Sequence, residues 1–132
     1  MEVRFLKNLL FTSYSMCFGG IEKALVNILK NINYNKYEVT LLLEKKEGIF
    51  LDEIPSNVIL KEYKISDNPI VLLRKIINRL KLVFFIASNY MKYDFSASFT
   101  TSSIPMGIIT RYLSKNNYLW VHNNYKDLYA RK

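Results

Sequence analysis

Apolar segments of two kinds alternate along the chain. Five short segments rich in leucine, aromatic and β-branched residues are predicted to be strands: 3–12, 37–43, 58–63, 94–99 and 118–122. Three longer segments place apolar residues at three- and four-residue steps and are predicted to be helices: 20–31, 70–91 and 105–114. A single helical turn is expected over 49–54, ended by Pro55. Alternating strands and helices predict an α/β fold with a mostly parallel sheet and helical crossovers.

Size and charge limit the classes of protein to consider. The chain has 132 residues, which is one domain of ordinary size (1–132), and half of its residues are apolar. Nineteen Lys and Arg against eleven Asp and Glu give a net charge of +8, which favours nucleic acid, an anionic membrane or phosphorylated ligands as partners. The single cysteine, Cys17, indicates a reducing compartment and therefore the cytoplasm. We identify no signal peptide and no apolar segment long enough to span a membrane.

The stretch from Leu9 to Asn31 is the strongest candidate for chemistry. It is predicted to be a strand, a turn at Gly19 and Gly20, and an amphipathic helix. The first N–H groups of such a helix lack intrahelical acceptors and lie at the positive end of its dipole, so they attract an anion. Glycine has no Cβ, so a phosphate could approach the backbone closely. The alternative is a tight strand-to-helix turn without a ligand. The phosphate-loop motif G-x-x-x-x-G-K-[ST] and the dinucleotide-binding motif G-x-G-x-x-G are both absent, which argues against an NTPase and a simple dinucleotide-binding protein.

Three motifs resemble the amino-terminal domain of family-4-type GT-B glycosyltransferases. They are F-G-G-I-E-K-A-L at 18–25, Y-E-V at 37–39 and W-V-H-N at 120–123. The resemblance covers nearly the whole chain and implies a Rossmann-like domain, the acceptor-side half of a two-domain transferase. It implies a nucleotide-sugar donor as co-substrate, with no other cofactor, and a lipid-linked or polysaccharide acceptor. Transfer with retention of anomeric configuration is implied by the family.

The resemblance also assigns residues. Gly19 and Gly20 would approach the donor diphosphate, and His122 would lie near the transferred sugar or the acceptor as the catalytic residue. The family's carboxyl-terminal domain, with its pair of glutamates spaced E-x7-E, has no counterpart here, because no two glutamates in this chain have that spacing. We therefore expect the chain to be inactive without that domain, which becomes an expected partner.

The remaining candidate residues are polar. His122 is the only histidine and could bind a sugar hydroxyl or move a proton; alternatively it is a strand-end histidine bonded to backbone. The negative charge of Glu22 would interact favourably with the dipole of the first helix. Alternatively, Glu22 would contact the acceptor substrate directly. Thr100 and Ser102 could bind sugar hydroxyls or serve only as loop and cap residues, and Asn123 adjoins His122. No cluster of ligands predicts a metal site.

The long helix at 70–91 is basic as well as apolar. No Asp or Glu occurs from 68 to 93, and its Lys and Arg residues are candidates for a membrane surface: Arg74, Lys75, Arg79 and Lys81. Ile70, Leu73, Ile77, Leu80, Phe84, Ala87 and Met91 recur at helical spacing. A basic amphipathic helix of this kind can lie on an anionic bilayer, here the inner face of the cell membrane. The alternative is a helix that packs on the core with a solvated basic edge.

The sequence is also compatible with a binding function without catalysis. The chain could be a non-catalytic basic Rossmann-like module that binds nucleic acid or anionic lipid. Ten Tyr and eight Phe could stack on bases, but they are spread through the apparent core segments rather than set among basic residues. We therefore do not expect nucleic acid as a partner.

Overall fold

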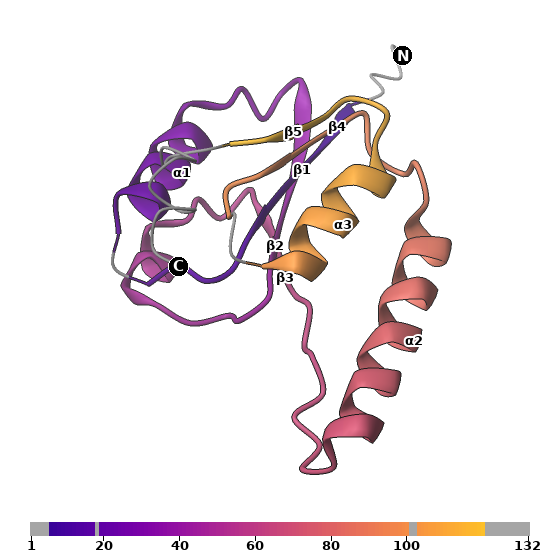
Figure 1. The fold of residues 1–132 in the computed structure, drawn as a ribbon. Helices are drawn as coiled ribbons and strands as arrows, with labels where there is room; N and C mark the ends of the chain where they lie inside the picture. The colour runs from indigo at the N-terminus through magenta and orange to yellow at the C-terminus, as the bar shows by residue number, and fades with distance from the viewer. Residues whose placement is uncertain (1–5, 18, 101–102, 121–132) are drawn as a thin grey trace, which may run out of the picture.

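One all-parallel sheet organises the protein. The computed structural model describes residues 6–17, 19–100 and 103–120. Five strands pair in the order β3-β2-β1-β4-β5 (Figure 1). Their bounds are β1 Lys7–Ser13, β2 Tyr37–Leu43, β3 Ile59–Glu62, β4 Phe95–Ser98 and β5 Asn117–Leu119. This confirms the predicted α/β class, and the sheet is consistent with a Rossmann-like fold.

The helical segments cover both faces of the sheet. α1 (Gly20–Asn31) and the 3₁₀-helix η1 (Ile49–Glu53) lie on one face, and α2 (Val71–Asn89) and α3 (Ile104–Leu113) lie on the other (Figure 1). α1 and β2 have the bounds that the sequence predicts. β3 and β4 are each one residue shorter at both ends than the sequence predicts.

Alternating strand residues build two cores. Phe11 and Leu41 point towards α1, whose Leu25 and Leu29 are buried against them. The neighbouring Leu10 and Leu42 point to the other face and pack with α3 through Met106, Ile109 and Leu113. Both faces of β1 and β2 are buried, as the nearly continuous apolar runs of these strands predict.

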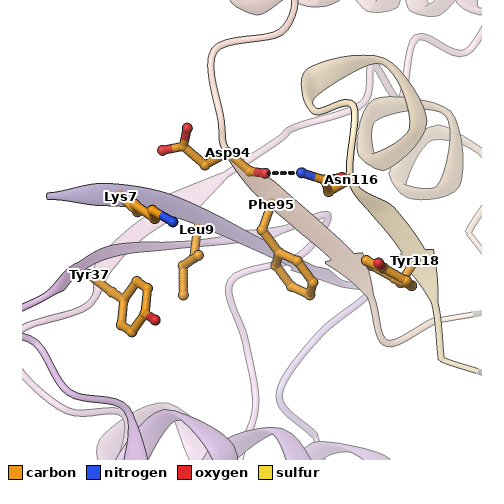
Figure 2. Close-up of a pocket in the computed structure, with 7 residues that line it drawn as sticks. All are labelled: Lys7, Leu9, Tyr37, Asp94, Phe95, Asn116 and Tyr118. Atoms are coloured by element: carbon orange, nitrogen blue, oxygen red, sulfur yellow. Dashed lines mark hydrogen bonds between the residues drawn. The ribbon is translucent and has the colours of Figure 1, made fainter.

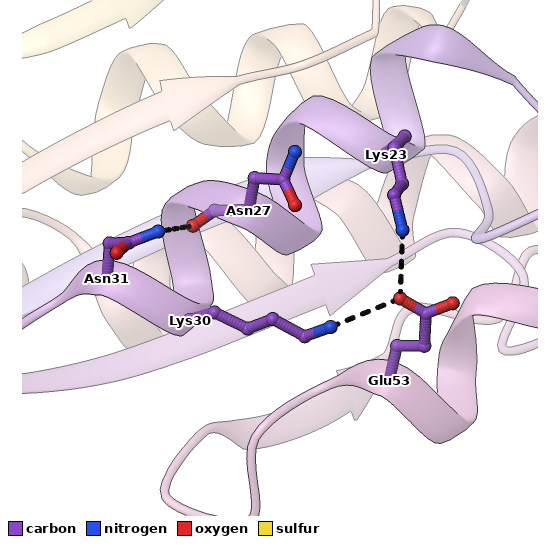
Figure 3. A network of polar contacts seen from close by, with 5 residues as sticks. All are labelled: Lys23, Asn27, Lys30, Asn31 and Glu53. Atoms are coloured by element: carbon purple, nitrogen blue, oxygen red, sulfur yellow. Dashed lines mark hydrogen bonds and ion pairs between the residues drawn. The ribbon is translucent and has the colours of Figure 1, made fainter.

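A polar contact joins α1 to η1. The Glu53 carboxylate accepts hydrogen bonds from Lys23 and Lys30, each at 3.2 Å (Figure 3). These bonds lower the pKa of Glu53 from its usual value. All three side chains are open to solvent, so the contact orients the two elements more than it stabilises them.

The apolar series that marks the long helix in the sequence does not face the core. Leu80 is 65% exposed and Phe84 is 75% exposed, and no residue of α2 is buried. Instead Leu82, Phe85 and Ile86, on another side of the helix, pack on the core beside α3. The ring centroids of Phe85 and Tyr63 are 5.2 Å apart. Among the described helices, none is long and apolar enough to cross a membrane.

Candidate functional site

The strand order places a topological switch point between β1 and β4. These two strands are neighbours, but the chain leaves β1 for α1 on one face and leaves β4 for α3 on the other (Figure 1). The two connections diverge at the carboxyl edge of the sheet. Open α/β sheets bind their ligands at such a switch point, so the structure places the candidate site here.

The loop from β1 to α1 is held by the loop that follows β2. The Met16 N–H donates to the Glu47 carbonyl at 2.9 Å, and the Phe50 N–H donates to the Met16 carbonyl at 3.0 Å. Further along the same contact, the Lys45 N–H donates to the Tyr14 carbonyl at 2.8 Å. The backbone amide of Met16 is therefore already occupied, and a ligand must use amides nearer to α1.

Gly48 makes this close contact possible, although its segment of the sequence carries no motif. Its φ is +125°, and a Cβ at this position would lie 2.0 Å from the Met16 carbonyl carbon. Only glycine fits that conformation and that distance. No pattern within the segment shows this, because the contact joins two loops that are far apart in the chain.

The glycine pair lies at the start of α1, and its two members have different surroundings. The Glu22 carboxylate folds back over Gly19, where an added Cβ would lie 2.2 Å from Glu22 Oε2. Among the residues that the structure describes, none has an atom within 4 Å of a Cβ built on Gly20, the first helical residue. Close approach to the backbone is therefore open at Gly20 and covered at Gly19. Glu22 itself supplies negative charge to the first turn of α1, as the sequence predicts.

A buried carboxylate lies at the start of α3. Glu44 directly follows β2, is only 8% exposed, and accepts a hydrogen bond from the Ser103 hydroxyl. Ser103 also caps α3, because its hydroxyl accepts from the Met106 N–H at 3.4 Å. The Tyr63 hydroxyl is buried nearby, and its pKa is raised by burial and then by the charge of Glu44. Sequence analysis did not single out Glu44; its only signal was a carboxylate directly after a buried strand.

Thr100 lies at the carboxyl end of β4 and is 7% exposed. Its backbone carbonyl accepts from the Ser98 hydroxyl at 3.2 Å, which ties the residue to the strand end. The ring of Trp120, just after β5, stacks on Phe99 with centroids 5.4 Å apart. Ser102, His122 and Asn123 lie outside the described residues, so their proposed roles stay predictions.

An open cleft of about 790 Å³ extends the same edge towards α2. Its lining combines acidic and basic side chains from the ends of β2 and β3 with the first turns of α2: Glu44, Lys46, Glu62, Lys64, Arg74 and Asn78. Within the ranges described above, no group of three potential metal ligands occurs. This edge is therefore built for polar contacts.

A second hollow lies at the opposite, amino edge of the sheet. It measures about 500 Å³ and is lined by Lys7, Leu9, Tyr37, Asp94, Phe95, Asn116 and Tyr118 (Figure 2). The Asn116 amide donates to the Asp94 carbonyl at 3.1 Å, and the rings of Phe95 and Tyr118 stack at 5.3 Å. This hollow has no helix N-terminus and lies away from the switch point, so we do not assign it as the site.

No protein-family model matches this chain, and no curated protein matches it in sequence. The candidate site is therefore defined by the fold and its local geometry.

Proposed function

We propose that this chain is the acceptor-side domain of a glycosyltransferase. It would transfer a sugar from a nucleotide-sugar donor to a lipid-linked or polysaccharide acceptor in the cytoplasm. The observation that carries the proposal is the open backbone at Gly20, at the N-terminus of a 12-residue helix beside the β1/β4 switch point. The F-G-G-I-E-K-A-L, Y-E-V and W-V-H-N motifs support the same assignment.

The residues divide into two roles in this proposal. The amides at the start of α1 have no acceptor within the helix and would hold the leaving diphosphate as its negative charge develops. Sugar hydroxyls of the acceptor would meet Glu22 and Thr100, with Ser102 and Asn123 beside them and His122 at the transferred sugar. A second domain, expected from the resemblance, would carry the rest of the donor site, so we expect no transfer by this chain alone.

Calorimetric titration tests the proposed anion site without requiring turnover. Uridine diphosphate is titrated into the wild-type chain and into Gly20→Ala. Gly107→Ala, in α3, is the matched control, because both glycines are helical and a Cβ on either has open space. The added Cβ should keep the phosphate from reaching the first amides of α1. A hydrogen bond to a charged group contributes about 1.5–3 kcal/mol, so losing one should make Gly20→Ala bind at least about tenfold more weakly. Gly107→Ala should bind as the wild type does.

Competition separates this proposal from the nucleic-acid alternative. A single-stranded oligonucleotide added in excess should leave diphosphate binding unchanged. Equal affinity of Gly20→Ala and the wild type, or displacement of the diphosphate by the oligonucleotide, would contradict the proposed function.

A further inference from the structure

α2 turns an apolar surface to solvent. Six of its exposed apolar side chains form what we call the outer face: Leu72, Leu73, Ile76, Leu80, Val83 and Phe84. They recur at three- and four-residue steps, so they share one side of the helix. An apolar surface of this extent on a helix that is already docked requires a partner or a function.

A different side of α2 attaches it to the protein. Leu82, Phe85 and Ile86 pack on the core, and α2 lies beside α3 while its N-terminal end extends past the rest of the ribbon (Figure 1). Near that end, the Ser66 N–H donates to the Asn78 side chain at 2.6 Å. The outer face is therefore additional to the surface that holds α2 in place.

Basic residues border the outer face on both sides. With about 100° of rotation per residue, Arg79 and then Lys75 follow one border, and Lys81 and then Arg74 follow the other. The Lys81 ammonium also donates to the Lys64 carbonyl. No Asp or Glu occurs from 68 to 93. Long basic side chains can extend their charged ends to a polar layer while their stems cover apolar surface.

This combination selects one partner. A second copy of α2 would bring like charges together without a carboxylate on this helix to pair with them. Nucleic acid would match the basic borders but offers no matching partner for the apolar stripe between them. An anionic bilayer provides phosphates at the borders and acyl chains between them.

We propose that α2 lies in the headgroup layer of an anionic membrane, with its outer face towards the acyl chains. The binding element is then the apolar stripe that sequence periodicity detects, together with the four basic residues. The proposal does not depend on sugar transfer, and it can hold if the proposed function fails. Arg74 and Asn78 also line the 790 Å³ cleft, so membrane binding would bring the carboxyl edge of the sheet towards the headgroups.

Vesicle flotation of the full chain tests the proposal. Vesicles of phosphatidylcholine with one third phosphatidylglycerol are compared with vesicles of phosphatidylcholine alone. The apolar variant is Leu80→Ser with Phe84→Ser, and its control is Ile49→Ser, which removes a side chain that is 63% exposed on η1, on the other face of the sheet. The charge variant is Lys75→Gln with Arg79→Gln, and its control is Lys36→Gln with Lys115→Gln, which are exposed elsewhere.

The expected results follow from the apolar and the electrostatic contributions to membrane binding. The apolar variant should lose at least about tenfold in partitioning, because it lacks two large side chains that would enter the acyl layer. The charge variant should lose roughly fivefold per residue on anionic vesicles only. Both controls should bind as the wild type does. Equal binding of the apolar variant and Ile49→Ser, or binding that does not depend on phosphatidylglycerol, would overturn the proposal.

A second experiment measures how deeply residue 84 enters the bilayer and does not rely on a loss of binding, which misfolding could also cause. In Phe84→Trp, we expect vesicle binding to shift the new tryptophan emission to the blue, and lipids brominated in the acyl chains should quench it. The wild type retains only Trp120, which stacks on Phe99 on the other face of the sheet and should not be quenched. No quenching in Phe84→Trp, or dimers of the wild type that mask α2 without vesicles, would also overturn the proposal.

Discussion

Glu22 and Gly20 are the two residues that decide whether the start of α1 accepts an anion. The Glu22 carboxylate covers Gly19 and already carries negative charge in the first turn, whereas Gly20 is open. A bound phosphate would therefore be attracted by the N-terminus of α1 and repelled by the Glu22 carboxylate. The affinity of the site reflects the balance of these two effects.

This balance predicts the effect of Glu22→Gln. Removal of the carboxylate charge should raise the affinity for uridine diphosphate about fivefold, since like charges near a solvated surface repel by on the order of 1 kcal/mol. The same change should lower the free energy of unfolding by about 0.3–1 kcal/mol, because the charge favours the helix dipole. Calorimetric titration and urea unfolding measure the two effects.

Glu38→Gln is the matched control for that change. Glu38 is exposed near the amino end of β2, so its loss alters net charge equally but away from the site. We expect it to change neither quantity appreciably. If Glu22→Gln and Glu38→Gln altered the affinity equally, the effect would come from net charge and not from a site at α1.

At the scale of elements, two loops act as one unit. The loop after β1 and the loop after β2 exchange backbone hydrogen bonds at Met16, and Gly48 allows them to touch. This contact sets the path of the chain into α1. On the other side of the site, the Ser103 hydroxyl caps α3 and donates to Glu44, which joins the end of β2 to the start of α3.

Gly48→Ala tests the loop unit. The new Cβ would meet the Met16 backbone, and φ of +125° is unfavourable for alanine, so we expect a loss of about 1–3 kcal/mol in the free energy of unfolding. Gly107→Ala should instead keep or raise stability, because alanine is favoured over glycine in a helix by roughly 0.5–1 kcal/mol. Urea unfolding followed by circular dichroism compares them. A Gly48→Ala protein as stable as the wild type would show that the loops need not touch.

Local patterns in the sequence predicted the bounds of elements well where turn residues mark their ends. α1 and β2 have the predicted bounds, since a glycine pair starts the helix and an asparagine-rich turn separates it from β2. α2 shows the limit of this reasoning. Two of its sides are apolar, and only contact with α3 and Tyr63 decides which side is buried.

At the scale of the whole molecule, the features that local patterns missed depend on distant contacts. Glu44 is buried, and the hydrogen bond that offsets this burial comes from Ser103, 59 residues later. The position of the site, by contrast, follows from the order of the strands, which places the ends of β1 and β4 side by side. The proposed function and the proposed membrane surface both use this carboxyl edge, where the cleft beside α2 begins.

The most direct test is to map where uridine diphosphate binds, by amide chemical-shift changes in the uniformly ¹⁵N-labelled chain. We expect saturable changes that are largest at Gly20, Ile21 and Glu22, with smaller ones at Ser103. These changes should be lost in Gly20→Ala but not in Gly107→Ala. Changes centred instead on the amino-edge hollow at Lys7 and Tyr118, or no saturable change at α1, would contradict it.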